Sequence, residues 1–270
     1  MSFSIAGKTA VVTGAANGVG LAVARHFVEK GANVMFADMD ESKLAEEVGQ
    51  VSEDDTGTVA YFAGDLREKL TIANLLSATI DRFDRADILV NASRQMLSSD
   101  PLNPDDDAVI DLLNQNLMTS LRVTQVFAKR MIKQARDSEG TDIPSGSIIN
   151  LSSIAARRTQ PELLAYSVSS AALDQMTRSM AVALAPHRIR VNAIALGSVM
   201  SASLQGALKD NEDFRDAIIE STPLHRIASA TELAEVAQFL ASDGSGFMTG
   251  QILTVDGGRT LVDAAEAPAH

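Results

Sequence analysis

The stretch Thr13-Gly14-Ala15-Ala16-Asn17-Gly18-Val19-Gly20 decides the fold of this 270-residue chain. It follows the β-branched run Thr9–Thr13, which is typical of a buried strand, and it opens a segment of helical period, Gly18–Lys30, that Gly31 can end. Its glycines let the backbone turn tightly and approach a ligand without a Cβ in the way. Because a helix N-terminus offers unpaired N–H groups and a partial positive charge, the loop predicts a pyrophosphate site. The alternative is a tight turn that holds no ligand.

Short β-branched runs alternate with longer segments of helical period along the rest of the chain. This pattern predicts an α/β fold, a doubly wound parallel sheet of about seven strands with helices on both faces, and residues 1–270 as one domain. A helix is predicted from Pro104 and the three acids after it to about Gln134, and Ser229-x-x-Glu232 predicts a capping box before Leu233–Leu240. We expect Arg136–Ser145 to be an exposed loop and Asp263–His270 to be frayed. The predicted strands are Thr9–Thr13, Asn33–Ala37, Thr58–Phe62, Asp87–Asn91, Ser147–Leu151, Arg190–Ile194 and Ile252–Val255.

The composition excludes several classes of protein. A formal net charge of -12 repels phosphate backbones, and no local basic patch offsets it, so we expect no nucleic-acid partner. No apolar run approaches the ~20 residues that a membrane helix needs, and Met1–Ala6 has no basic segment typical of a signal peptide. The chain has no cysteine, so we expect no disulfide and no thiolate nucleophile, and we predict no metal site. The expected location is the cytoplasm.

Further segments accompany the glycine loop. Gly146-Ser147-Ile148-Ile149-Asn150-Leu151-Ser152-Ser153 and Tyr166-Ser167-Val168-Ser169-Ser170 lie in the second half of the chain, and Thr249-Gly250 and Val255-Asp256-Gly257-Gly258 lie near its C-terminus. In these motifs and their order, the chain resembles the short-chain dehydrogenase/reductase family over roughly residues 5 to 258. The resemblance implies a Rossmann-type fold, an NAD or NADP cofactor, a small-molecule carbonyl or alcohol substrate such as a 3-oxoacyl compound, and a homo-oligomer, either a tetramer or a dimer.

One acidic residue bears on the choice of cofactor. Asp38 lies 24 positions beyond Gly14, at the end of the second predicted strand, where a carboxylate can accept hydrogen bonds from ribose hydroxyls and repel a 2′-phosphate. This favours NAD over NADP, although Asp38 could instead cap the next helix, as Asp40 could. The resemblance adds an adenine contact at Asp65 and positions around the nicotinamide. The predicted cofactor-binding residues are Gly14, Asn17, Gly18, Val19, Gly20, Asp38, Asp65, Leu66, Asn91, Ala92, Tyr166, Ser170, Gly197 and Val199.

Three residues are predicted to be catalytic. Hydride transfer to or from a carbon–oxygen group also needs a proton moved at the oxygen, and Tyr166, one of only two tyrosines, is the predicted acid and base. Ser153 can hydrogen-bond the same oxygen and stabilise its developing charge. By resemblance, Asn116 matches a helix asparagine that anchors an ordered water in the proton path. Taken singly, these residues are better interpreted as a core tyrosine, a turn cap and a solvated helix position, but their joint spacing favours a catalytic ancestry.

The chain departs from the family at the position four residues after the tyrosine, where Ser170 replaces a lysine. In the family the lysine binds the nicotinamide ribose and stabilises the tyrosinate with its charge, which a serine hydroxyl does not provide. A tyrosine phenol in water ionises with a pKa near 10, so oxidation of an alcohol should suffer most. The nearest cations in the sequence are Arg94, Arg157 and Arg158, and we expect all three to be solvated surface residues.

Two more departures lie at cofactor-facing positions, Ser93 for a glycine and Leu196 for a proline. Together with Ser170 they predict altered handling of the nicotinamide beside an intact adenosine site. Two hypotheses follow: an NAD-linked oxidoreductase of low or unusual activity, and a nucleotide-binding protein without catalytic activity. An apolar substrate pocket under a lid is predicted from Met96, Leu97, Leu163, Leu164, Met200, Leu204 and Leu208, which could also be core residues.

Overall fold

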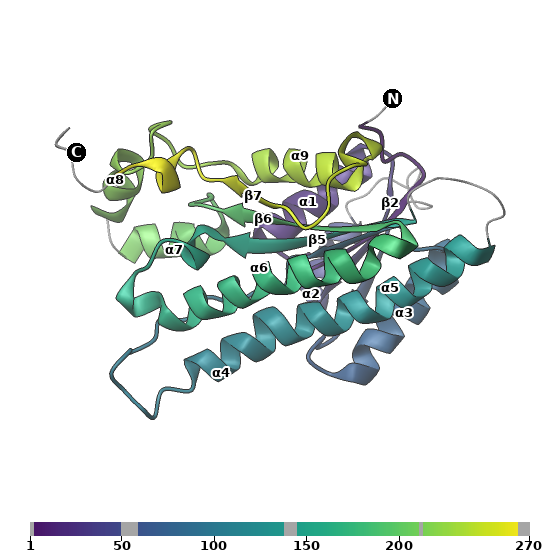
Figure 1. The fold of residues 1–270 in the computed structure, drawn as a ribbon, viewed down its shortest axis with the longest axis horizontal. Helices are drawn as coiled ribbons and strands as arrows, with labels where there is room; N and C mark the ends of the chain where they lie inside the picture. Colours follow the sequence, from purple (N-terminus) through teal and green to yellow (C-terminus); the bar gives the residue numbers. More distant parts are fainter. Residues whose placement is uncertain (1–2, 50–58, 138–144, 211–212, 264–270) are drawn as a thin grey trace.

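Parallel strands form a single sheet at the centre of the protein (Figure 1). The computed structural model describes residues 3–49, 59–137, 145–210 and 213–263, and within them the sheet has seven strands in the order β3-β2-β1-β4-β5-β6-β7. The strands are β1 (Thr9–Thr13), β2 (Asn33–Asp38), β3 (Val59–Ala63), β4 (Ile88–Asn91), β5 (Gly146–Ser153), β6 (Ile189–Leu196) and β7 (Ile252–Val255). The predicted fold class and the seven strands are therefore confirmed, although β4 begins at Ile88 and not at Asp87, and Thr58 lies outside the described residues.

Helices cover both faces of the sheet. In Figure 1, α1 and α9 lie on one side of it and α3, α5 and α6 on the other. None of the described helices combines the length and the hydrophobicity needed to cross a membrane. The α-helices are α1 (Gly18–Glu29), α2 (Glu41–Gly49), α3 (Lys69–Phe83), α4 (Ala108–Leu112), α5 (Thr119–Asp137), α6 (Leu164–Leu184), α7 (Ala202–Asp210), α8 (Asp213–Glu220) and α9 (Ala230–Ala241).

The inner strands are buried on both faces because their side chains alternate between two hydrophobic cores, whereas the outer strands β3 and β7 are partly exposed. Ala10 and Val12 of β1 belong to the core under α1 and α9, whereas Val11 belongs to the core under α3, α5 and α6. Continuous β-branched and aliphatic runs without polar alternation therefore form this sheet. The predicted capping box of α9 is confirmed, because the Ser229 side chain accepts the Glu232 N–H and the Glu232 side chain accepts the Ser229 N–H.

The sheet reverses its strand order between β1 and β4, which are neighbours although two strands separate them in the sequence. Loops leave the carboxyl ends of strands in opposite directions at such a point, and ligands bind in the crevice between them. Thr13 ties the two strand ends together, since its Oγ1 accepts the N–H groups of Ala92 and Ser93, each at 3.1 Å. This fixed crevice positions the candidate site.

Several predicted boundaries differ from the structure. The helix expected from Pro104 begins only at Ala108, because Asp106 accepts the N–H groups of Asp100 and Ala108 and so holds the preceding residues in turns. The helical segment ends at Asp137, so Arg136 is helical and does not belong to the predicted loop. Residues 138–144 of that predicted loop lie outside the described residues, and so do residues 264–270 of the predicted frayed end. Strands β5 and β6 each extend two residues beyond their predicted ends because they pair with each other up to Ser153 and Leu196.

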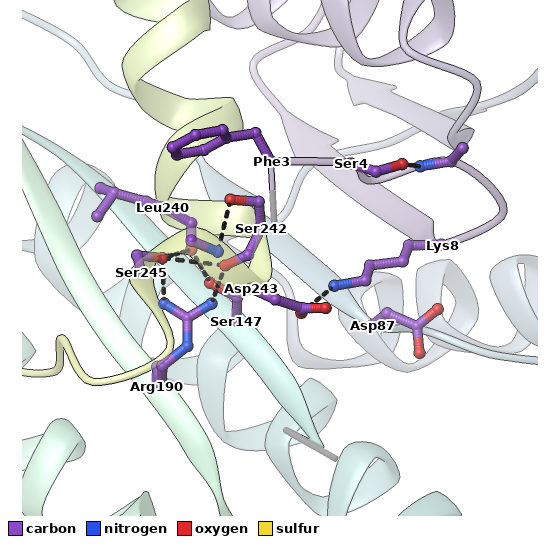
Figure 2. Close-up of polar contacts among 12 residues, drawn as sticks. Phe3, Ser4, Lys8, Asp87, Ser147, Arg190, Leu240, Ser242, Asp243 and Ser245 are labelled. Atoms are coloured by element: carbon purple, nitrogen blue, oxygen red, sulfur yellow. Dashed lines mark hydrogen bonds and ion pairs between the residues drawn. The ribbon is translucent and has the colours of Figure 1, made fainter. Parts of the chain in front are cut away.

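A buried arginine lies at the amino-terminal end of β6, opposite the end at the crevice (Figure 2). Arg190 of β6 is 7% exposed, and its guanidinium donates to the Ser245 hydroxyl at 2.7 Å and to the Ser242 carbonyl at 3.0 Å, just beyond the end of α9. Burial lowers the pKa of Arg190 from its usual range. A cation at a helix C-terminus complements the helix dipole, so this contact fixes α9 on the sheet far from the crevice.

Candidate active site

A cleft of about 470 Å³ opens at the carboxyl edge of the sheet, lined by the loops that follow β1, β4, β5 and β6. It brings together most of the residues predicted from the sequence. Those that line it are Gly14, Asn17, Gly18, Val19, Gly20, Asp38, Ala92, Ser153, Tyr166, Gly197 and Val199. Five predicted residues do not line it: Asp65, Leu66, Asn91, Asn116 and Ser170.

The glycine loop meets β4 and α1 too closely for side chains. Gly14 has a φ of +68°, and a Cβ on it would lie 2.8 Å from the Ala92 backbone. A Cβ on Gly20 would lie 2.1 Å from the Gly14 carbonyl oxygen. The N-cap residue Asn17 makes no side-chain cap bond, and the first turn of α1 holds no acid. The N-terminal N–H groups of a twelve-residue helix therefore face the cleft without a side-chain acceptor, which fits an anion such as a pyrophosphate.

Asp38 ends β2 and supports the same loop. Its Oδ2 accepts the Ala16 N–H at 3.1 Å, and its Oδ1 accepts the Met39 N–H at 2.7 Å. The cap of α2 is instead Asp40, whose Oδ1 accepts the Ser42 hydroxyl and the Lys43 N–H. The hydrogen bond from Ser42 is the main cause that lowers the pKa of Asp40 to about 2. The alternative role for Asp38 as a helix cap is thus filled by its neighbour.

Ser153 and Tyr166 approach the cleft from two different elements. Ser153 is the last residue of β5, and its hydroxyl accepts the Ala155 N–H at 3.1 Å in the 3-10 turn η3 (Ile154–Ala156). Tyr166 lies in the first turn of α6, and its ring packs in an apolar cluster with Leu112 and Ala155. Each of the two residues is 6% exposed. A phenol and a hydroxyl that line the same cleft are suited to hydrogen-bonding the oxygen of a substrate.

Arg94 contradicts the expectation that it is a solvated surface residue. Its side chain is half-buried, lines the cleft, and donates from Nη1 to the Tyr166 hydroxyl at 2.5 Å. Arg157 and Arg158 are exposed as expected, although Arg158 also lines the cleft. The sequence placed Arg94 only three residues beyond Asn91, and nothing in the pattern showed which way its side chain would turn.

Asn116 lies in a short π-helix, η2 (Leu113–Met118), between α4 and α5. Its Oδ1 accepts the Gln95 N–H at 2.8 Å, and its Nδ2 donates to the Gln95 carbonyl at 2.9 Å and to the Ser169 hydroxyl at 3.3 Å. The amide side chain therefore holds the segment that follows β4. Insertions of this kind in helices are frequent at functional sites. The role of Asn116 in a proton path stays a prediction.

The other predicted residues outside the cleft have local partners. Asp65 binds the Arg67 guanidinium, whose hydrogen bonds are the main cause of a lowered pKa of Asp65. Asn91 donates to Thr124 of α5 and to Asn150 of β5. Ser170 is 5% exposed on α6, and Leu66 is also buried.

The two other substitutions lie in the cleft lining. Ser93 does not have a positive φ, so a serine causes no backbone strain there. Leu196 ends β6 and lines the cleft. Of the residues predicted for an apolar pocket, Met96, Leu163 and Leu204 line the cleft, and Leu97 packs on the cluster around Tyr166. Leu164, Met200 and Leu208 do not line it.

Sequence reasoning missed two features of the site. Asp174, one turn beyond Ser170, is 4% exposed and accepts the Ser152 hydroxyl at 2.6 Å. Burial raises the pKa of Asp174 more than that hydrogen bond lowers it. Arg259 also lines the cleft and donates to the Ser198 hydroxyl at 3.1 Å. The only signal for Arg259 was its place directly after the Val255–Gly258 motif.

Comparisons with known proteins identify the family. The family described as enoyl-(acyl carrier protein) reductase matches residues 14–260. A 3-oxoacyl-(acyl-carrier-protein) reductase of Thermotoga maritima is 33% identical over 258 residues, which cover 94% of this chain and 98% of that protein. The crystal structure of a gluconate 5-dehydrogenase from Burkholderia cenocepacia with NADP and tartrate has a TM-score of 0.85 at 30% identity, covering 97% of this chain and 98% of the other.

A 7α-hydroxysteroid dehydrogenase complexed with NADH and 7-oxo glycochenodeoxycholic acid has a TM-score of 0.86 at 26% identity and covers 95% of this chain and 96% of its own. All three similar proteins are dehydrogenases or reductases, and they match this chain over nearly its whole length. The chain is an oxidoreductase of the short-chain dehydrogenase/reductase family.

Proposed function

We propose that the protein interconverts a carbonyl compound and a secondary alcohol with NAD(H) bound in the cleft. The single observation that carries this proposal is the meeting of two groups on one cleft: the uncapped N-terminus of α1 and the Ser153–Tyr166 pair. The first group suits the pyrophosphate of a dinucleotide, and the second suits the oxygen of a carbonyl or alcohol. Gly197 and Val199, which follow β6, would border the nicotinamide between them.

The residues of the chain would handle the oxygen and its proton. When bound, the dinucleotide supplies or accepts the hydride. In the direction of reduction, the Tyr166 hydroxyl gives its proton to the carbonyl oxygen while the Ser153 hydroxyl donates a hydrogen bond to it. In the direction of oxidation, the Tyr166 phenolate takes the proton from the alcohol. The apolar packing around Tyr166 fixes its position for both directions.

Asp38 favours NAD over NADP. Its carboxylate lines the cleft beside the glycine loop, where it can accept hydrogen bonds from ribose hydroxyls but repels a phosphate. The similar proteins include one complexed with NADP and one complexed with NADH, so the choice varies among them. Calorimetric titration of the protein with NADH and with NADPH tests it. We expect tighter binding of NADH, and tighter binding of NADPH would contradict the role given to Asp38.

The charges of the cleft favour a substrate with an anionic group. Arg94, Arg158 and Arg259 line it, whereas Asp38 is the only acid among its described lining residues. In a chain with net charge -12, the described lining of this cleft thus holds three arginines and one acid. Tartrate and 7-oxo glycochenodeoxycholic acid, which are bound by two of the similar proteins, are acids. We therefore propose oxo acids or hydroxy acids, including acyl compounds with a carboxylate or a phosphate, as the substrate class.

A steady-state assay over paired substrates tests the function and the substrate class together. Each pair contains an oxo acid and its neutral amide, assayed with NADH and NADPH and compared with a Tyr166→Phe variant. We expect turnover that prefers the acid and that Tyr166→Phe abolishes. Equal rates for acid and amide would contradict the substrate class alone. Binding of NADH without turnover of any compound would favour the nucleotide-binding protein without activity.

A further inference from the structure

We propose that Arg94 is a catalytic residue that supplies the positive charge at the Tyr166 phenol. The proposal rests on the proposed function and concerns how its proton transfer works in a chain with a serine at position 170. Arg94 Nη1 lies 2.5 Å from the Tyr166 hydroxyl oxygen, the atom that gains and loses the proton. Ser170 is buried one turn along α6, and its side chain carries no charge.

The guanidinium charge of Arg94 is available to the phenol. No carboxylate within the described residues lies at ion-pair distance from it, although other arginines of the chain, such as Arg67 and Arg226, are paired with acids. Its only other hydrogen bond with a described residue goes to the Ser152 carbonyl, at 3.4 Å. An arginine does not lose its proton in proteins, so this positive charge persists at every pH at which the enzyme is folded.

The direction of the hydrogen bond decides what the phenol can do. A guanidinium only donates, so the Tyr166 oxygen accepts from Arg94 and its own hydrogen remains free to point toward the substrate. In reduction, the phenol O–H bond breaks, the proton forms the new O–H bond of the alcohol, and the phenolate left behind lies against the cation. Arg94 cannot return that proton because a guanidinium does not lose its own protons in a protein. The phenolate must therefore regain its proton from water on the cleft side.

The backbone on both sides of Arg94 is fixed. The Ser93 N–H is bound by Thr13 at the end of β1, and both backbone groups of Gln95 are bound by Asn116. The Arg94 side chain then reaches over Tyr166, with Cζ 5.9 Å from the ring centroid. Asn116 thus positions Arg94 through the segment that it holds, which gives this buried asparagine a part in the site without a place on the cleft wall.

The acidic residues on the elements around Tyr166 either are exposed or bind other groups. Its ring packs against apolar side chains of α4, η3 and η4 (Pro161–Leu163). The acids in these elements, Asp111 and Glu162, are exposed. On α6 itself, Asp174 binds Ser152, not the phenol. Arg94 is accordingly the group whose removal should move the ionisation of Tyr166.

The composition of the chain makes this ionisation directly measurable. Tyr61 and Tyr166 are the only tyrosines, and there is no tryptophan. In a Tyr61→Phe protein, the tyrosinate absorbance in the near ultraviolet reports Tyr166 alone, and Tyr61 is a partly exposed residue of β3 that does not line the cleft. We expect its transition at lower pH than in the same protein unfolded in urea. Arg94→Gln should move the transition to higher pH, and Arg94→Lys should move it less.

Matched variants separate this charge effect from a general disturbance. Arg157→Gln removes an exposed arginine of the same region that does not line the cleft, and we expect no change in the transition. Tyr61→Phe/Tyr166→Phe should show no transition at all. A transition at the same pH with and without Arg94, or one no lower than in the urea-unfolded protein, would overturn the proposal. The titration needs no turnover, whereas the proposed function fails if no pyridine nucleotide supports turnover.

Discussion

Ser170→Lys introduces a lysine one turn after Tyr166, and we expect it to change alcohol oxidation by less than about threefold, which is less than about 0.7 kcal/mol. Half-ionising a phenol at neutral pH requires about 4 kcal/mol relative to its ionisation in water. Two opposite charges about 4 Å apart attract by about 4 kcal/mol at an effective dielectric constant of 20. The proposal assigns this attraction to Arg94, whose Nη1 lies 2.5 Å from the Tyr166 oxygen, so a second cation should add little.

The surroundings of position 170 also limit what a lysine can do there. The side chain is 5% exposed, so an ammonium would be taken out of water. Asp174 lies four residues further along the same helix, where it can pair with a lysine at position 170. Burial raises the pKa of Asp174, and an ammonium beside it would favour its charged form. The lysine ammonium would thus interact mainly with the Asp174 carboxylate and less with the Tyr166 phenol.

Steady-state oxidation of the best alcohol, measured at one pH for all variants, tests this expectation. Ser170→Met is the matched control, since it fills a similar volume without charge. In an Arg94→Gln background, Ser170→Lys should raise the rate by more than the factor of about three expected in the wild-type protein, because no guanidinium then lies on the phenol oxygen. A gain of tenfold or more from Ser170→Lys alone, about 1.4 kcal/mol, would refute the reasoning, because it would show that the charge at Tyr166 was missing.

Asp38→Asn should improve NADPH binding relative to NADH by about tenfold, measured by calorimetry, because it removes the repulsion of a 2′-phosphate; an unchanged ratio would contradict this. Arg190→Met should lower the free energy of unfolding by about 2 kcal/mol in urea titrations without affecting NADH affinity, since two charged hydrogen bonds are lost and only part of that loss is offset by no longer burying a charge. Asp174→Asn keeps an oxygen for Ser152 and should raise Tm at neutral pH. Burial raises the pKa of Asp174 in the folded state, so its contribution to stability is present below the unfolded pKa and is lost as the pH rises through the folded one. The gain in Tm should therefore shrink near about pH 4, and an equal gain at both pH values would be evidence against it.

The fold was predictable because its decisive signals are local. A β-branched run, a glycine loop and a helical period follow one another at Thr9–Glu29, and the structure forms β1, the loop and α1 there. The ends of strands were less predictable, because pairing sets them. Ser153 is the last residue of β5 and does not lie in the turn after it, because it pairs with Leu196, the last residue of β6.

The site was predictable only where a residue's position fixes its direction. Ser153 lines the cleft at the carboxyl end of β5, and Tyr166 lines it in the first turn of α6. Arg94 lies in a loop, and its direction depends on the clamp that Thr13 and Asn116 make around its neighbours. The contact between Arg94 and Tyr166 therefore cannot be predicted from the spacing of these residues along the chain. The asparagine was singled out from the sequence, but the residue that it holds became visible only in three dimensions.

A crystal structure with NAD and a substrate analogue tests the central claim most directly. The account predicts an analogue oxygen within hydrogen-bond distance of both the Ser153 and Tyr166 hydroxyls, with the Arg94 guanidinium still on the phenol oxygen. An Arg94 side chain turned away to another anion, with no cation left beside Tyr166, would contradict it.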